Sequence, residues 1–397
     1  QAARKIVEAR AQRVPQAASV KDPMLCANYY PEEVQTAAGP QQFSLNASQQ
    51  FHWFGKLDRR AAVAEAAVDM ARADLAAKEL EVVEQVKQAY FELYFLQRAT
   101  AISERDRRLL VDFARIAQTK YETAKVSQQD LLRAQVEISV LDNELIRLRQ
   151  QTASAQARLA RLLHISPETR VAALEQLNRQ QVPQDIEWLY QRAIAARPEL
   201  HAQLAAVFRD RQSVELARTD YVPDATLGAT WISTGEGGIS PVSNGRDAVL
   251  VGLNVNVPIY RRRLDAAVRE AEAQAVASAR QYDALRDRTA EQVKDLFAQA
   301  ISQRDLLGMF SQEILPKADQ TLQVSIRAYE VDTVDFLTLI DNWRQLLRFE
   351  IAYHRLEAEL RHTLEQMERT IGGPLAAAPT GVPAPPEAIP PAVPATP

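Results

Sequence analysis

The sequence predicts a mainly α-helical fold with a smaller β component, built as two copies of one unit. Ala, Leu, Glu, Gln and Arg dominate and only 12 of 397 residues are Gly, which is a composition typical of long helices. Two helical patterns each continue for about 65 residues, which corresponds to a rod of about 100 Å. A pair of strand-like segments precedes each of these patterns.

The duplication is indicated by short matches that recur in the same order. The Glu-Gln-Val-Lys segment at 84–87 returns at a distance of 291 − 84 = 207 residues. Two further pairs recur at 222 − 14 = 208 and 329 − 121 = 208 residues. The matches are 84–87 with 291–294, the Val-Pro pair 14–15 with 222–223, and the Tyr-Glu pair 121–122 with 329–330. Because the offset is nearly constant, we interpret the chain as two copies of one unit.

Each copy is expected to contain a short helix, two strands, a very long helix and a returning helix. In the first copy these are 1–14, 24–30, 43–50, 56–120 and 127–164, with a loop at 31–40. In the second copy they are 198–220, 225–231, 249–259, 264–328 and 335–371. The predicted organisation is therefore a first repeat at 1–164, a linker with a short helix at 165–197, a second repeat at 198–372, and a disordered Pro/Ala-rich tail at 373–397.

The long helices carry an apolar stripe with steps of three, four and seven residues. In the first copy this stripe contains Leu75, Val82, Val86, Ala89, Leu93 and Leu96. Such a stripe is typical of a coiled coil or of a large helical assembly. On the helices alone, a soluble coiled-coil rod remains an alternative.

The strand pairs favour a membrane channel over a plain rod. Along 249–259 one face would carry Val, Leu and Ile, and the other face would carry Leu, Gly, Asn and Pro. Along 225–231 one face would carry Ala, Leu and Trp, and the other face would carry Thr and Gly. Period-two alternation over such a length is typical of a strand in a membrane barrel with its apolar face toward lipid. Aromatic residues cluster at the strand ends, as in an interfacial girdle. They are Tyr29, Tyr30, Phe51, Trp53, Phe54, Trp231 and Tyr260. A small soluble sheet that caps a helical bundle is the alternative.

A membrane strand pair has a consequence for assembly. Four strands from one chain cannot pair their own edges in lipid, where only a closed barrel leaves no backbone group unpaired. Several chains must therefore each contribute their strands. This argument predicts an oligomer and does not give the number of subunits.

Other classes of protein find little support. The net charge of −4 argues against nucleic-acid binding. The five His residues are scattered, no HExxH, GxSxG or phosphate-loop motif is present, and the four Met residues form no cluster with His or Cys. We therefore predict no enzyme, no cofactor and no metal site.

No apolar run is long enough for a transmembrane helix. Cys26 is interpreted as an ordinary strand residue, and because Gln1 already lies in a helical pattern, we expect a processed or truncated start.

The order of these elements resembles the TolC-like outer-membrane efflux protein family over residues 1–372. The segments that carry this resemblance are Arg-Pro-Glu-Leu at 197–200, Val-Pro-Ile-Tyr at 257–260, and the segments that begin at Tyr121 and Tyr329. The segments 22–25 and 53–57 resemble the heavy-metal efflux branch. The resemblance implies a homotrimer with a twelve-stranded barrel in the outer membrane and an α-helical tunnel across the periplasm. It also implies a periplasmic adaptor as partner and an inner-membrane pump, of the RND type in this branch.

The resemblance places two helix-hairpin turns at the periplasmic end. The family usually has Gly three residues after the turn tyrosine, where this chain has Ala124 and Asp332. Ala and Asp disfavour positive φ, which leaves the local geometry open. The candidate adaptor contacts are Ala124, Lys125, Val126, Ser127, Asp332, Thr333 and Val334. These residues could also be simple hairpin connections.

The resemblance further implies a channel gate beside these turns. Aspartates narrow the tunnel in the family, and the matching residues are Thr338 and Asp341, so that a single acidic ring is expected here. Tyr329 and Asp130 match two members of the family's closing latch, whereas Val334 stands where the third member is an arginine, so that a weaker or different latch is expected. Asp341 could equally be an ordinary solvated residue. The runner-up function is a periplasmic adaptor or structural coiled-coil protein.

Overall fold

The structure is a computed structural model, and it describes residues 1–124, 126–174, 177 and 181–375. The chain divides into two compact units. Unit 1 contains residues 1–76 and 198–286, and unit 2 contains residues 77–197 and 287–397. Each unit therefore takes segments from both of the predicted repeats.

Unit 1 contains an antiparallel sheet with the strand order β1-β2-β3-β4. The strands are β1 (Met24–Thr36), β2 (Gly39–Phe51), β3 (Ala225–Thr234) and β4 (Ala248–Val255). Leu45 of β2 lies opposite Ala27 on one side and Trp231 on the other. The two strand pairs of the sequence therefore join edge to edge, with the two hairpins contributing neighbouring strands.

The predicted loop at 31–40 is wrong, because most of it is strand. β1 continues to Thr36, and only two residues separate it from β2. Pro31 is tolerated because it lies between Tyr29 and Val34, where the pairing of β1 with β2 is interrupted, so its missing N–H breaks no ladder bond with β2. The pairing register shifts between Tyr29 and Val34, which absorbs the irregularity. Gly39 closes the turn with φ 131°, and a Cβ there would lie 1.9 Å from the Gly235 carbonyl oxygen.

The predicted strand at 249–259 is too long at its C-terminal end. β4 ends at Val255, and residues 256–260 form the connection to the next helix. Pro258 cannot donate a backbone hydrogen bond, so the alternating pattern continues beyond the residues that pair. The side chains of Val257 and Ile259 remain exposed.

The helices of unit 1 are α1 (Ala2–Ala11), α2 (Arg13–Ala18), α6 (Pro198–Thr219), and the first parts of α3 (Lys56–Glu122) and α7 (Arg261–Met309). The predicted first helix at 1–14 is in fact two helices, and the second runs through Pro15. Pro15 is the third residue of α2, in the first turn, where an N–H has no intrahelical partner to lose.

Unit 2 contains the rest of α3, which is followed by α4 (Gln128–Leu163) and α5 (Ile186–Ala196). It also contains the rest of α7, which continues into a π-helical segment η1 (Phe310–Ile314), α8 (Leu315–Glu330) and α9 (Phe336–Thr370). The prediction of one continuous helix at 264–328 is therefore wrong in one respect. Residues 310–314 form π-helical turns, and Pro316 is the second residue of the α-helix that follows them. The corresponding helix of the first copy, α3, is α-helical over 67 residues.

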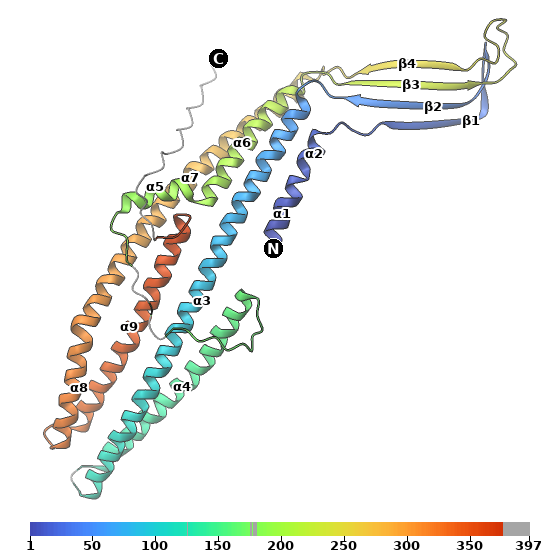
Figure 1. Cartoon of the computed structure of the whole chain (residues 1–397). Coiled ribbons are helices and arrows are strands. Elements are labelled where there is room, and N and C mark those ends of the chain that lie inside the picture. Colours follow the sequence, from blue (N-terminus) through green and yellow to red (C-terminus); the bar gives the residue numbers. More distant parts are fainter. Residues whose placement is uncertain (125, 175–176, 178–180, 376–397) are drawn as a thin grey trace. The chain divides into compact units, whose positions relative to one another are not determined.

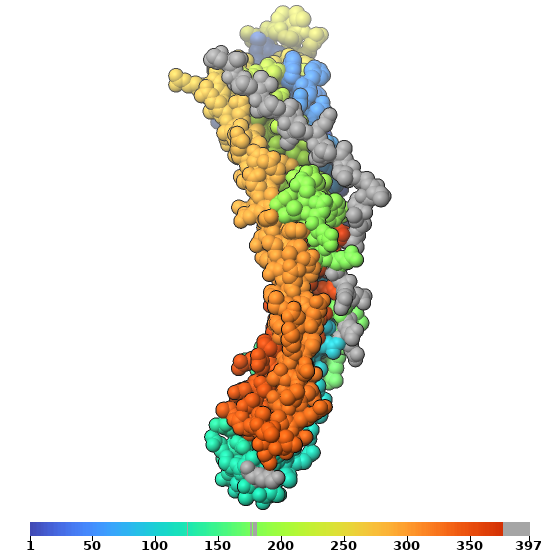
Figure 2. All heavy atoms as spheres, turned by 90° about the vertical axis from the view of Figure 1, so that its left-hand side faces the viewer, coloured from blue at the N-terminus to red at the C-terminus, as the bar shows by residue number. Residues whose placement is uncertain are grey.

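Two antiparallel hairpins dominate unit 2, namely α3–α4 and α8–α9. Their turns lie at the same end of the unit in both views, as Figure 1 and Figure 2 show. A cluster of buried side chains from α3, α4, α8 and α9 joins the two hairpins near this end. The packing of both hairpins into one core fixes the position of their turns.

Candidate functional site at the hairpin turns

Each of the two turns has one residue in the left-handed region, although neither turn contains glycine. Ala124 has φ 59° and Asp332 has φ 60°, both in the left-handed region. The two residues are related by 332 − 124 = 208 positions, the offset of the repeat. Non-glycine residues in this region cost about 1–2 kcal/mol each. The chain thus keeps the bend expected of a glycine turn and accepts the steric strain.

A capping residue follows each turn at the same spacing. The Ser127 hydroxyl accepts a hydrogen bond from the Gln129 amide at the start of α4. The Asp335 carboxylate accepts one from the Thr338 amide at the start of α9. The cap satisfies an N–H that the helix itself leaves unpaired, which sets the first residue of each returning helix.

The candidate adaptor residues lie at the surface. Ala124, Ser127, Asp332 and Thr333 are exposed, and Val126 and Val334 are partly buried. Lys125, the remaining candidate, lies outside the described residues. The two turns together therefore present a small polar surface at one end of unit 2.

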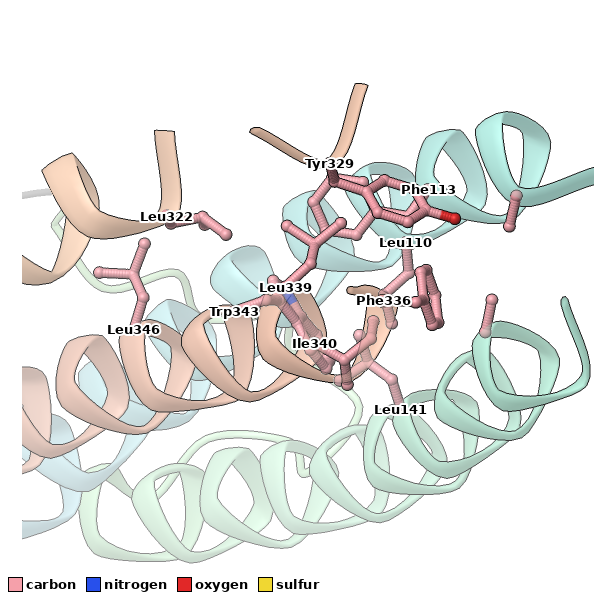
Figure 3. Close-up of a cluster of buried hydrophobic side chains, with 12 residues drawn as sticks. Leu110, Phe113, Leu141, Leu322, Tyr329, Phe336, Leu339, Ile340, Trp343 and Leu346 are labelled. Carbon is pink, nitrogen blue, oxygen red and sulfur yellow. The ribbon is translucent and has the colours of Figure 1, made fainter. Parts of the chain in front are cut away.

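A buried cluster supports this surface from inside (Figure 3). The cluster contains Leu110, Phe113 and Ala117 of α3, Ala134 and Leu141 of α4, Leu322 and Tyr329 of α8, and Phe336, Leu339, Ile340, Trp343 and Leu346 of α9. The Tyr329 and Phe336 ring centroids are 5.5 Å apart. Because all four helices contribute, a shift of either hairpin near its turn must disturb this packing.

Tyr329 is a buried member of the predicted latch. Its side chain is 2% exposed, and its hydroxyl has no hydrogen-bond partner among the described residues. Burial, together with the charges of Asp130 and Asp332, raises the pKa of Tyr329 to about 12. Burial also raises the pKa of Asp130, in opposition to the nearby Arg133. Tyr329 and Asp130 are thus close enough to interact electrostatically, and the structure records no hydrogen bond between them.

The two candidate constriction residues differ in their surroundings. The Thr338 hydroxyl donates a hydrogen bond to the Asp335 carboxylate, which lowers the pKa of Asp335. The Asp341 side chain is 59% exposed and forms an ion pair of 3.1 Å with Arg344, one turn further along α9. Arg344 also pairs with Glu137 of α4. Asp341 is therefore linked through Arg344 to the first hairpin, which its sequence position did not indicate.

Sequence reasoning missed Lys120, which joins the two hairpins. Its ammonium group donates to the carbonyl oxygens of Tyr329 and Glu330 and to the Asp332 carboxylate. It also lies 4.7 Å from the centre of the Tyr329 ring. The Lys120 side chain is only 10% exposed. The available signal was its spacing, because Phe113, Ala117 and Lys120 follow the four-and-three steps of a buried stripe.

Among the described residues, no group of three or more His, Cys, Asp or Glu side chains is placed to hold a metal ion. None of the helices in the described ranges combines the length and the apolar character needed to cross a membrane.

Comparison with known proteins links this architecture to a family. The model of the family described as "Outer membrane efflux protein" matches residues 1–163 and 189–373. Cobalt-zinc-cadmium resistance protein CzcC of Cupriavidus metallidurans is 22% identical over 324 residues, which are 80% of this chain and 74% of that protein.

Solved structures share the fold. The outer membrane protein VceC of Vibrio cholerae superposes with a TM-score of 0.79 at 18% identity, over 94% of this chain and 92% of that chain. CusC superposes with a TM-score of 0.78 at 18% identity, over 94% of this chain and 88% of that chain. Because the family model matches both repeats almost completely, the chain belongs to the outer membrane efflux protein family and is a channel subunit rather than an enzyme.

Proposed function

We propose that three copies of this chain form one channel, with their sheets closed into a single barrel in the outer membrane. Three copies of a four-stranded sheet would give twelve strands. The helices would continue as a tunnel into the periplasm. The channel would conduct substrates passively from a pump and its adaptor to the exterior.

The observation that carries this proposal is the state of the sheet edges. Among the described residues, β1 and β4 each have one edge without a strand partner. Val249, Val251 and Leu253 of β4 are 72%, 73% and 63% exposed. An apolar edge strand of this kind is an aggregation hazard in water, but it fits a barrel in which the next subunit pairs with the edge and lipid covers the side chains.

The assembly can be tested by extraction and mass measurement. We expect the full chain to fractionate with outer membranes, to require detergent for extraction, and to run as a trimer by light scattering corrected for detergent. A monomer that stays soluble without detergent would instead favour the structural or adaptor protein with helical hairpins.

The exposed turns support a contact with a periplasmic adaptor. We infer that Ala124, Val126, Ser127, Asp332, Thr333 and Val334, together with Lys125, form this contact. The turns present side chains and polar backbone at one end of unit 2, as a docking surface for another helical hairpin would require. Through the adaptor the channel would serve an inner-membrane pump, and we suggest one of the RND type.

We propose that the channel conducts metal cations. The name of the matched relative CzcC refers to resistance to cobalt, zinc and cadmium. We infer a gate made of Asp341, Thr338, Asp130 and Tyr329, in which Asp341 would provide one carboxylate per subunit. A ring of like charges attracts cations, although Arg344 at 3.1 Å partly neutralises each carboxylate.

Replacing Asp341 with alanine tests the acidic ring. Because the trimer loses three carboxylates, D341A should weaken block by a trivalent cation such as La³⁺ roughly tenfold in planar bilayers. The control D319A removes an exposed acid of α8 and should leave block unchanged. Equal block in the wild type, D341A and D319A would remove Asp341 from the gate.

A further inference from the structure

We propose that Lys120 is the positioning residue of the gate, a clasp by which the first hairpin of a subunit holds the turn of its second hairpin. The proposal rests on the proposed channel function and names a residue that sets the position of the α8–α9 turn. It concerns contacts within one subunit, all of them inside unit 2.

The position of Lys120 gives its ammonium group three hydrogen-bond acceptors. The three acceptors are two backbone carbonyls of α8 and the carboxylate of Asp332, which matches the three N–H donors of a lysine. A nearly buried ammonium group without such partners would be strongly unfavourable. The contact therefore holds only while the end of α8 stays in place against α3.

The two carbonyls explain why a cation suits this position. Tyr329 and Glu330 are the last two residues of α8, so their carbonyl oxygens lack the amide donors that a continued helix would supply. The Tyr329 carbonyl accepts a hydrogen bond from the Asp332 amide as well as from Lys120. The same end of α8 carries the negative pole of the helix dipole. Lys120 thus caps the C-terminus of α8 from another hairpin, which couples the ending of α8 to the position of α3.

The strained residue of the turn takes part in the same contact. Asp332 has a positive φ that an aspartate disfavours, and its carboxylate pairs with Lys120. A glycine at this position would relieve the strain and lose the ion pair. The left-handed aspartate is therefore explained by the contact that it makes.

The first hairpin holds the second in this way, but the second does not hold the first, because the equivalent positions of the repeat carry different residues. At an offset of 208 residues, the counterpart of Lys120 is Ala328 and the counterpart of Asp332 is Ala124. The second hairpin consequently has neither group with which to hold the first in the same way. The α8–α9 turn is the part that the clasp holds.

A hinge for the movement of the turn lies at the other end of α8, in η1. The repeat offset is 207 at Glu84 and Glu291 but 208 at Tyr121 and Tyr329, so the second copy has one extra residue between these points. The π-helical segment η1 lies in this interval, and a π-bulge is how a helix accommodates an extra residue. None of its residues is buried, and Gly308 and Pro316 flank it. Release of Lys120 would then leave fewer contacts that hold the α8–α9 turn against α3, with η1 as the hinge about which this turn moves.

Channel recordings on the reconstituted full-length protein test the clasp. K120M keeps the length of the side chain and removes its charge, and we expect the open-state population to rise about tenfold. K120R should behave nearly as the wild type, since it restores the cation. The matched control K317M removes a lysine of α8 that is 73% exposed and forms an ion pair with Glu313 on the same face, and it should change nothing.

Hydrogen exchange provides a second readout that does not need channel activity. K120M should speed amide exchange in the last turn of α8 and the first turn of α9, whereas K317M should not. If K120M fails to assemble, D332N removes only the carboxylate and should give a smaller shift in the same direction. Wild-type gating and exchange in assembled K120M, or in D332N where K120M does not assemble, would overturn the clasp.

The clasp and the channel function can fail separately. If D341A changes cation block but assembled K120M gates as the wild type does, the clasp is wrong and the channel stands. If the wild-type protein forms no conducting trimer, the proposed function itself is wrong.

Discussion

Replacing Phe336 with alanine is expected to lower the free energy of unfolding of unit 2 by about 3–5 kcal/mol, the usual cost of emptying a well-packed aromatic site. Phe336 is 1% exposed and is the first residue of α9. It contacts a core to which all four hairpin helices contribute (Figure 3). Little relaxation is available there, because Tyr329 and Leu339 are themselves almost fully buried.

The neighbouring residue provides the control for this prediction. Leu337 is 43% exposed, so L337A removes a similar apolar side chain without opening a cavity. The free energy of unfolding is measured by denaturant unfolding, with hydrogen exchange of the α8 and α9 amides as the probe. It should fall strongly in F336A and by less than about 1 kcal/mol in L337A. Similar losses for both variants would mean that the cluster does not hold the turns.

The long helices were predictable because their signal is repeated many times. The predicted helix at 56–120 differs from α3 by two residues at its end, and the predicted returning helices at 127–164 and 335–371 differ from α4 and α9 by one residue at each end. The β1–β2 hairpin was not predictable in the same way. Residues 31–40 contain two prolines, and Pro31 is compatible with a strand because the pairing of β1 with β2 is interrupted between Tyr29 and Val34.

Some functional residues could likewise be predicted from the sequence, whereas others depend on tertiary contacts. The duplication located both turns, since Ala124 and Asp332 occupy the left-handed positions at the repeat offset. The spacing of Lys120 could place it on a buried stripe, but its partners could not be found from the sequence, because two of its acceptors are backbone carbonyls about 210 residues away and a carbonyl has no residue identity. The interaction of Asp341 with Arg344 was visible as an i, i+3 pair, but the link from Arg344 to Glu137 depends on tertiary packing.

A buried ionic cluster should make the stability of unit 2 depend on pH. Lys87 of α3 donates hydrogen bonds to the carboxylates of Glu365 and Glu368, both on α9. Glu365 is 5% exposed, and burial raises its pKa to about 7 from an ordinary value of 4.5. Burial opposes ionisation of Glu368 too, but hydrogen bonds from Lys87 and the Leu375 amide outweigh it and lower the pKa of Glu368.

The sign of the effect follows from the raised pKa of Glu365. Between pH 4.5 and 7 the folded state binds a proton at Glu365 that the unfolded chain has released. This residue therefore contributes stability that is fully present below pH 4.5 and is lost as the pH rises through 7. At about 1.4 kcal/mol per pKa unit, the loss is at most about 3 kcal/mol.

The variant E365Q should remove this loss, because a glutamine keeps the shape and cannot ionise. We expect its apparent Tm at pH 8 to exceed that of the wild type, and the difference to shrink toward pH 5. E368Q is the matched control with the opposite sign: it removes a carboxylate whose lowered pKa stabilises the folded state above pH 4.5, so it should be less stable than the wild type at pH 8. Thermal scans of the detergent-solubilised protein between pH 5 and pH 8 distinguish these outcomes. Parallel curves for the wild type and E365Q would show that Lys87 neutralises Glu365 fully, so that burial of this carboxylate costs the folded state nothing at neutral pH.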